Sequence, residues 1–323
     1  MQVNKNPPPF RCWIITEGMV GTENQCLGVA AALGVAAEVK RIHLRQPWKM
    51  LSPWLGAEAA CTFDPPLEGP WPDLLLAAGR KSIAASRYIK KQSGGKTLTV
   101  QIQDPRIDPA QFDIVAVPAH DPTRGPNVIV TDGAPNLITP QKLNAAKEKW
   151  AQAFSSLPAP RVAVLIGGSS KAHKMTKEIA RSVGEKLAHL ARTQNAGLMI
   201  TASRRTGEEN MAALRAALNG VDAFIWDGSG DNPYHGMLAW ADFIVVTSDS
   251  VSMLSDAGTT GKPVYMIPLD GGSARFDRFH VGLIGKGVAR VFDGTLEHWT
   301  YTPLNAAQVI AGAVINALGQ KKN

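Results

Sequence analysis

The chain has 323 residues, of which 45% are hydrophobic and 19% are charged, a composition that excludes disordered and fibrous proteins and suits a soluble protein of two domains. Its 34 Lys and Arg against 27 Asp and Glu give a net charge of +7. No basic run with interleaved aromatic residues accompanies this excess, so we expect no nucleic-acid partner; the charge suits small anionic ligands or an anionic membrane surface.

The cysteines and the first residues predict a cytoplasmic protein. Cys12, Cys26 and Cys61 lack CxxC spacing and are odd in number, which indicates buried thiols in a reducing compartment. The start, MQVNKNPPPFRCWIIT, has no apolar stretch of signal-peptide length before its prolines. The longest charge-free apolar stretch, residues 26–37, is too short to span a bilayer.

Short apolar runs alternate with helical patterns in the first half of the chain. Residues 11–16 predict a buried strand, and residues 22–33 have helical spacing with Thr22 as the expected N-cap. A further helix is expected over 81–92, and further strands over 37–44, 73–79, 97–102, 112–118 and 127–133. This half therefore predicts an open α/β sheet.

A second alternation follows residues 154–160, FSSLPAP, whose small residues and prolines indicate a linker. Strands are expected over 161–168, 197–203, 222–227, 242–248 and 263–269, with helices over 175–192, 208–218, 233–241 and from residue 250. Apolar strands joined by helices predict a parallel sheet in each half. A last amphipathic helix, 304–318, has no strand after it.

The fold class is therefore α/β, with two Rossmann-type parallel-sheet domains facing across a cleft. We place the domains at residues 1–157 and 158–303, followed by a terminal segment at 304–323. Ligands of such sheets bind outside the carboxyl ends of the strands, so the loops that follow the strands hold the candidate residues.

Several common site motifs are absent from the sequence. GGKT at residues 94–97 lacks the first glycine of a P-loop, and no GxGxxG follows the first strand. HExxH, GxSxG and clustered Cys or His are also missing, so we expect no metal site and exclude NTPase, dehydrogenase, zinc hydrolase and serine hydrolase activities.

Two strand ends offer donors for an anion. Gly167, Gly168, Ser169 and Ser170 follow one strand and precede a helix, where amides and hydroxyls can hold an anion. The alternative is a tight turn that needs glycine. Arg204 and Arg205 follow the next strand, and since adjacent side chains diverge, we expect only one of them to meet phosphate oxygens; the alternative is a solvated pair.

The stretch 232–268 holds the remaining candidates. Ser248, Asp249 and Ser250 end a buried strand and open a helix that carries Ser252 and Asp256. A carboxylate at residue 256 can accept two ribose hydroxyls. The alternative is N-capping by Ser248 or Ser250, with Asp256 as a solvated helix residue.

This stretch resembles the donor-binding region of GT-B glycosyltransferases, which cradles a nucleotide-diphospho-sugar. Asn232, Tyr234 and Met253 complete the contacts expected there. More closely, the chain resembles the mitochondrial fission protein family, named for a plant elongated-mitochondria mutant. The matching segments are WIITEGMVGTENQ, GRKSIAASRYIK, QIQDPR, FDIVAVPAHD, GPNVIVTDGAPNLIT, LIGGSSK, SRRT and NPYHGMLAWADFIVVTSDSVSMLSDAGTTGKPV.

The resemblance implies a GT-B-like fold, with residues 1–157 on the acceptor side, residues 158–303 binding a nucleotide sugar, and the last helix crossing back to the first domain. It implies a UDP-sugar donor but no established reaction, because plant members are described as adaptors that help recruit a dynamin-related protein to mitochondria. Asp256 stands where such proteins typically carry Glu, so its reach toward a ribose is shorter.

A transferase also needs a base for the acceptor hydroxyl. Glu17 follows the first strand, and His120 with Asp121 follows the strand over 112–118, where an imidazole can work near neutral pH. The alternatives are that Glu17 caps the helix that begins near Thr22, and that His120 orders its loop by hydrogen bonding.

Residues 47–56, PWKMLSPWLG, are apolar without a strand pattern. Trp48, Leu51 and Trp54 would form a peripheral membrane patch near an envelope glycolipid or a lipid-linked acceptor. The alternative is a loop folded over the core.

Two functions from different classes follow. The first is a metal-independent glycosyltransferase that uses a nucleotide-diphospho-sugar, and the second is a non-catalytic adaptor at membranes. A sugar epimerase is excluded on the premise that it needs NAD and a Tyr-x-x-x-Lys pair, because none of the four tyrosines has a lysine four residues later and GxGxxG is missing.

Overall fold

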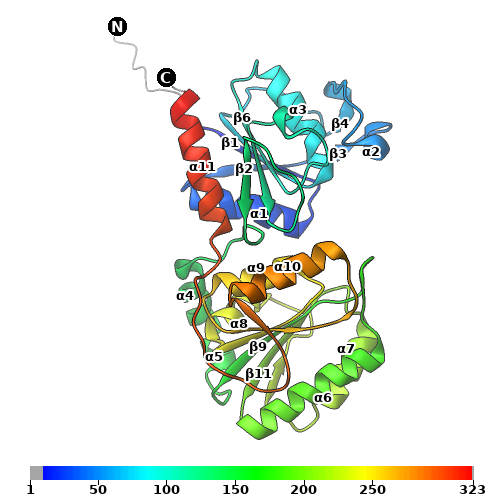
Figure 1. Ribbon diagram of the computed structural model, residues 1–323, viewed down its shortest axis with the longest axis vertical. Coiled ribbons are helices and arrows are strands. Elements are labelled where there is room, and N and C mark those ends of the chain that lie inside the picture. The colour runs from blue at the N-terminus through cyan, green and yellow to red at the C-terminus, as the bar shows by residue number, and fades with distance from the viewer. Residues whose placement is uncertain (1–9, 322–323) are drawn as a thin grey trace. The chain divides into compact units, whose positions relative to one another are not determined.

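The computed structural model describes residues 10–321 (Figure 1). Residues 1–9 lie outside the described part. They belong to the N-terminal stretch in which the sequence predicts no signal peptide. The chain forms two compact units: an N-terminal unit that runs to Leu137 and resumes at Asn305, and a C-terminal unit of Ile138–Leu304.

The N-terminal unit is built on a six-stranded sheet in which all strands run parallel in the order β2-β1-β5-β6-β7-β8. These strands are β1 (Cys12–Thr16), β2 (Ala37–Arg41), β5 (Leu74–Ala78), β6 (Leu98–Ile102), β7 (Ile114–Pro118) and β8 (Val128–Thr131). The helices of the unit are α1 (Val20–Ala32), α2 (Trp48–Leu51), α3 (Ile83–Gln92) and α11 (Ala306–Lys321).

Helix α11 belongs to the N-terminal unit although it is the last element of the chain. It packs against α1 and lies along this unit in red in Figure 1. Ile310 and Val314 are fully buried and share a core with Cys26 and Val29 of α1. The core of the N-terminal unit is therefore completed by a helix that follows the C-terminal unit in the sequence.

The C-terminal unit contains a second parallel sheet, in the order β12-β11-β9-β13-β14-β16. Its strands are β9 (Arg161–Ile166), β11 (Gly197–Ala202), β12 (Ala223–Ile225), β13 (Phe243–Thr247), β14 (Val264–Ile267) and β16 (Ala289–Val291). Its helices are α4 (Pro140–Lys149), α5 (Ala151–Phe154), α6 (Lys177–Gln194), α7 (Glu208–Ala217), α8 (Tyr234–Trp240), α9 (Val251–Thr259) and α10 (Ala274–Gly285).

The strand order of the C-terminal sheet marks where a ligand can bind. In chain order the strands read 3-2-1-4-5-6, so successive connections reverse direction between β9 and β13. Ligands of open parallel sheets bind in the crevice at the carboxyl ends of the strands where this reversal occurs. The predicted class, two α/β units with parallel sheets, is confirmed.

The boundary between the units lies earlier than the predicted residue 157. Helices α4 and α5 belong to the C-terminal unit because Phe154 is fully buried in its core and Trp150 packs beside it. Gly236 of α8 makes room for Trp150, since a Cβ there would overlap the indole ring. The prolines at 158 and 160 therefore lie inside the second unit, between α5 and its first strand.

Several elements differ from the predicted ones. The strand expected over 37–44 breaks at Ile42, after which β3 (His43–Leu44) pairs antiparallel with β4 (Phe63–Asp64). A second two-stranded ribbon joins β10 (His173–Lys174) to β15 (Asp270–Gly271). The prediction missed α10, whose buried Phe279 and Leu283 lie one turn apart, and it missed the edge strand β16.

Within residues 10–321, none of the helices has the length and hydropathy that a bilayer span requires. Cys12 and Cys26 are buried as expected, whereas Cys61 is exposed.

Truncation of Ile310 tests whether α11 completes the N-terminal core. Ile310→Ala should lower the free energy of unfolding by about 2–4 kcal/mol, because it removes a fully buried side chain and leaves a cavity. Ile315→Ala, one and a half turns further and 58% exposed, is the control and should change it by less than about 0.5 kcal/mol. Urea unfolding followed by circular dichroism measures both, and equal effects would contradict the assignment.

Candidate functional site

Three loops at the carboxyl ends of neighbouring strands meet at the carboxylate of Asp249. This side chain is fully buried and accepts hydrogen bonds from Gly168 N (3.0 Å), the Thr247 hydroxyl (2.7 Å) and the Arg205 guanidinium (2.8 Å). The Thr247 hydroxyl also accepts from Gly167 N at 2.7 Å. The loops after β9, β11 and β13 are thus joined at the reversal point of the sheet.

Close packing explains the paired glycines after β9. A Cβ on Gly167 would overlap the Asp249 carboxylate, and one on Gly168 would overlap the backbone of Arg205. Neither glycine has a positive φ. Glycine is needed here because the loops approach closely. This agrees with the alternative prediction of a tight turn that requires glycine.

The amides and hydroxyls of this loop already have partners within the protein. Ser169 N donates to Arg205 O and Ser170 N to His173 O. The Ser169 hydroxyl accepts from Met175 N, and the Ser170 hydroxyl accepts from the amides of Ala172 and His173. The loop also leads into β10 rather than into a helix, because α6 begins only at Lys177, capped by Thr176. This loop therefore positions its neighbours, and charge for an anion must come from elsewhere.

The two arginines after β11 differ in their contacts. Arg205 lies across the loop after β9, and its guanidinium is 43% exposed while bonded to Asp249. Arg204 is exposed, and the part of the chain that the structure describes offers it no hydrogen bond or ion pair. The two side chains diverge as expected, one held against the loops and the other left in solvent.

The loop between β13 and α9 is held in the same way. Ser250 caps α9 by accepting from Met253 N, and the Ser248 hydroxyl accepts from Leu269 N. Met253 is half-buried against the core, whereas Ser252 is exposed. His280 of α10, which no sequence motif indicated, contacts Ser248 O through Nε2 at 2.9 Å. The capping alternative thus holds for Ser250, whereas the Ser248 hydroxyl joins this loop to the end of β14.

Asp256 lies in a second cluster, formed by α9, α8 and α4. The Tyr234 hydroxyl donates to its carboxylate at 2.8 Å, and the Asn232 side chain, just before α8, accepts from Tyr234 N. Burial raises the pKa of Asp256 to about 7, although the Tyr234 hydroxyl and the positive charge of Lys142 lower it. Asp256 is therefore not the solvated helix residue of the alternative interpretation.

Lys142 and His235 complete this cluster. Burial lowers the pKa of Lys142, while Asp256 raises it. Burial and the charge of Lys142 lower the pKa of His235 to about 4, so the imidazole is neutral at physiological pH. No group of three His, Cys, Asp or Glu side chains suited to a metal occurs among residues 10–321.

The candidate bases lie apart within the N-terminal unit. Glu17 follows β1 and pairs with Lys81, which follows β5, at 2.9 Å. Strands β1 and β5 flank the reversal point of this sheet. His120 and Asp121 are buried after β7, with Nε2 and Oδ1 3.9 Å apart. Since β7 is three strands from β1, about 14 Å separates the two candidate positions.

Neither Glu17 nor Thr22 caps helix α1, although the sequence offered both as N-terminal caps. Helix α1 begins at Val20 with Met19 at its N-cap, and the Thr22 hydroxyl donates back to Met19 O. Glu17 therefore makes an ion pair across the strand ends rather than a helix cap.

The apolar segment after β3 divides into a buried and an exposed part. Trp48 is half-buried against the core and donates to Gly56 O, so it is not part of an exposed patch. Met50, Leu51 and Trp54 are 66%, 41% and 63% exposed. The Arg87 guanidinium holds the loop beneath them by donating to Pro53 O, Leu55 O and Glu58.

The raised pKa of Asp256 predicts a pH-dependent stability. The carboxyl titrates near 3.8 in the unfolded chain and near 7 in the folded one, so the folded state binds more protons and loses stability as the pH rises between these values. Asp256→Asn carries no charge at either pH. Its free energy of unfolding, relative to that of the wild type, should therefore be about 2 kcal/mol higher at pH 8 than at pH 5.

Urea unfolding at the two pH values measures this difference. Asp231→Asn is the control, because Asp231 is exposed and its ion pair with Lys149 lowers its pKa. The free energy of unfolding of Asp231→Asn, relative to that of the wild type, should not increase when the pH is raised. An advantage of Asp256→Asn that is the same at both pH values would refute the argument.

Comparison with solved structures shows the fold. The UDP-GlcNAc 2-epimerase of Neisseria meningitidis, bound to UDP-GlcNAc, superposes with a TM-score of 0.50 at 15% identity, over 95% of this chain and 99% of that one. A putative UDP-N-acetylglucosamine 2-epimerase of Listeria monocytogenes gives 0.55 at 13% identity, over 97% and 89%. These likenesses confirm the GT-B-like architecture.

Comparison of sequences shows the family. The mitochondrial fission protein ELM1 of Arabidopsis thaliana is 27% identical, over 91% of this chain and 88% of the plant protein. An uncharacterised protein of Rickettsia prowazekii is 30% identical, over 78% and 81%. The model of the family described as mitochondrial fission ELM1 matches residues 20–318. The chain therefore belongs to the mitochondrial fission ELM1 family.

Proposed function

We propose that the C-terminal unit binds a nucleotide-diphospho-sugar at the loops joined by Asp249, and that the protein transfers the sugar to an envelope or lipid-linked acceptor. The observation that carries this proposal is the position of Arg204 and Arg205. They follow β11, next to the reversal point of the sheet, where open α/β sheets bind their ligands. The Arg205 side chain is 43% exposed, and Arg204 is exposed as well.

Although the sequence favours only one arginine as a phosphate ligand, both side chains are exposed to solvent, and in this proposal both neutralise the diphosphate that leaves when the sugar is transferred. A guanidinium fork forms two parallel hydrogen bonds to phosphate oxygens, which suits this role. Because Asp249 binds one nitrogen of Arg205, the guanidinium is already oriented before a ligand arrives. The charge stabilisation in this proposal comes from side chains rather than from a metal.

Asp256 would accept the ribose hydroxyls and Tyr234 would orient its carboxylate through their hydrogen bond. For the base that activates the acceptor, Glu17 is the first candidate, because it lies at the reversal point of its own sheet. His120 with Asp121 is the second. The UDP-GlcNAc bound to the Neisseria epimerase makes UDP-sugars the first donors to test.

Binding of UDP and UDP-GlcNAc by titration calorimetry tests the donor site. Arg204→Ala should weaken binding about tenfold, since one charge-assisted phosphate contact contributes roughly 1.4 kcal/mol. Arg205→Ala should weaken it further because it also leaves Asp249 buried and unpaired. Arg215→Ala, an exposed arginine of α7 outside these loops, should bind as the wild type does.

The outcomes separate the two functions. Binding that Arg204→Ala weakens supports the donor site, whereas no binding of any nucleotide diphosphate at millimolar concentration favours the non-catalytic adaptor, which the family name fits. Incubation of the protein with UDP-GlcNAc in the absence of an acceptor distinguishes transfer from epimerisation, because an epimerase converts the sugar nucleotide without an acceptor and a transferase needs one. The sequence excluded a sugar epimerase on the premise that it needs NAD. Because epimerases share this fold, epimerisation is again an outcome of this test.

Met50, Leu51 and Trp54 would bring the acceptor side of the protein to a membrane, where a lipid-linked acceptor lies. Arg45 and Lys49 are exposed in the same segment and carry the charge that attracts anionic headgroups. The Arg87 contacts hold the loop in place, so little ordering is needed on binding.

Substitution of Trp54 tests this contact. Trp54→Glu should reduce co-sedimentation with phosphatidylglycerol vesicles about tenfold or more, because it replaces a large interfacial side chain with an anion. Its melting temperature should stay within a few degrees of the wild type. Val281→Glu, at a 68% exposed position on α10, is the control and should sediment normally. Unchanged sedimentation of Trp54→Glu would overturn the membrane contact.

A further inference from the structure

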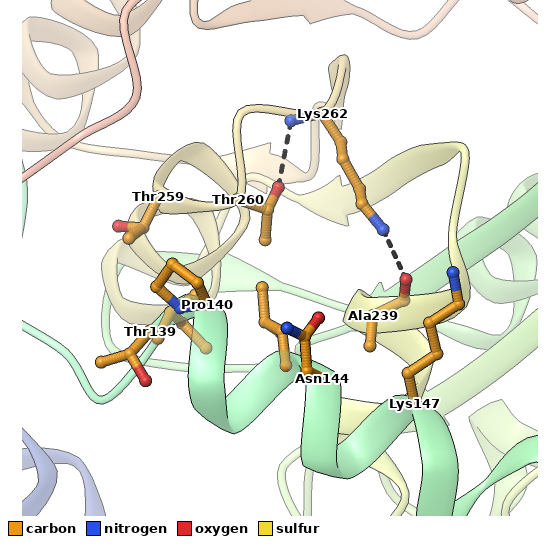
Figure 2. A pocket seen from close by; sticks show the side chains of 10 residues that line it. Thr139, Pro140, Asn144, Lys147, Ala239, Thr259, Thr260 and Lys262 are labelled. Carbon is orange, nitrogen blue, oxygen red and sulfur yellow. Dashed lines mark hydrogen bonds between the residues drawn. The ribbon is translucent and has the colours of Figure 1, made fainter.

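A separate pocket of about 310 Å³ opens in the C-terminal unit (Figure 2). It lies between the start of α4 and the last residues of α8 and α9, and no residue of the loops that meet Asp249 lines it. Its lining consists of Ile138, Thr139, Pro140, Leu143, Asn144, Lys147, Ala239, Thr259, Thr260 and Lys262. The proposed donor site does not use this pocket.

Lys262 is fixed at the wall of the pocket. Its ammonium group donates to Leu238 O at 2.7 Å and to Ala239 O at 2.8 Å, at the end of α8. Its backbone is held by the Thr260 hydroxyl and by Tyr301, whose hydroxyl donates to Lys262 O. An ammonium has three N–H donors, so these two carbonyls leave the third for a ligand in the pocket.

Lys147 supplies a second positive charge from α4. Its amino group lies 5.4 Å from the centre of the Trp240 ring, and the Trp240 indole donates to Lys147 O. Figure 2 shows the side chains of Lys147 and Lys262 reaching toward the carbonyl of Ala239 from two different elements. Among the described residues that line the pocket, none is acidic.

Burial and two nearby charges act on the Lys262 ammonium group. Burial lowers its pKa to about 8; Asp242 raises it and Lys147 lowers it. The ammonium form therefore predominates at pH 7 and is lost as the pH rises through 8. A dianion in the pocket would lie close to both lysines and would stabilise the charged form.

We propose that this pocket is a binding site for a small phosphate monoester, whose dianionic phosphate lies between Lys147 and Lys262. Two cations without a lining carboxylate match a dianion in charge, and the volume suits a phosphate with a short carbon chain or one sugar ring. The Asn144 amide, at the same wall, is available to the rest of the ligand. The site is independent of the proposed donor site.

Titration calorimetry with inorganic phosphate and with sulfate tests the site. Both should bind at pH 7, and Lys147→Met should weaken each about fivefold or more. Lys149→Met, on the same helix but outside the lining, is the control and should bind as the wild type does. Sulfate stays a dianion at both pH values, so its affinity should fall about tenfold from pH 7 to pH 9 as Lys262 loses its proton.

Two further variants complete the test. Lys262→Met should abolish the pH dependence, and circular dichroism checks that the loss of its contacts with α8 leaves the fold intact. If that variant does not fold, Lys147→Met still decides. The absence of phosphate binding at millimolar concentration, or binding that Lys147→Met retains and Arg204→Ala abolishes, would overturn the proposal. The second outcome would assign the anion to the proposed donor site, so the two proposals fail separately.

Discussion

The hydrogen bonds to the buried carboxylate of Asp249 hold together the part of the molecule on which the proposed function rests. A buried carboxylate is costly unless it is paired and fully hydrogen-bonded. Here Gly168 N, the Thr247 hydroxyl and the Arg205 guanidinium meet that requirement, and each comes from the end of a different strand. A side chain at residue 167 would overlap this carboxylate, and one at residue 168 would overlap the backbone of Arg205, so both positions need glycine.

This arrangement changes how the strand-end loops can be interpreted. A glycine and serine turn after a strand suggests a phosphate cradle, yet its four amides donate to groups within the protein. The network positions Arg205 instead, and both arginines follow β11, next to the reversal of strand order between β9 and β13 where parallel sheets bind ligands.

The cationic side chains that enter the site analysis and the proposals lie at three places in the C-terminal unit. Arg204 and Arg205 lie at the strand ends, Lys142 lies beside Asp256 and Tyr234, and Lys147 and Lys262 line a pocket. Only the first pair belongs to a motif that the sequence displays. Lys142 and Lys147 are surface-type lysines in a helix whose sequence, PQKLNAAKEK, shows nothing unusual.

The sequence by itself determined the parallel α/β class, most strands of both sheets and the family, because apolar runs of strand length and ordered motifs are local features of the chain. The loops at residues 167–170, 203–206 and 247–250 were also evident, since each directly follows a buried strand.

Tertiary structure alone decided which polar groups of these loops have hydrogen-bond partners within the protein and which are exposed to solvent. The bond between Arg205 and Asp249 joins residues 44 positions apart, and the assignment of α4 to the second unit depends on Trp150 packing against Gly236. Such pairings arise from strand order and close packing between distant segments. A linear pattern does not encode them, because it records neighbours along the chain and not across the sheet.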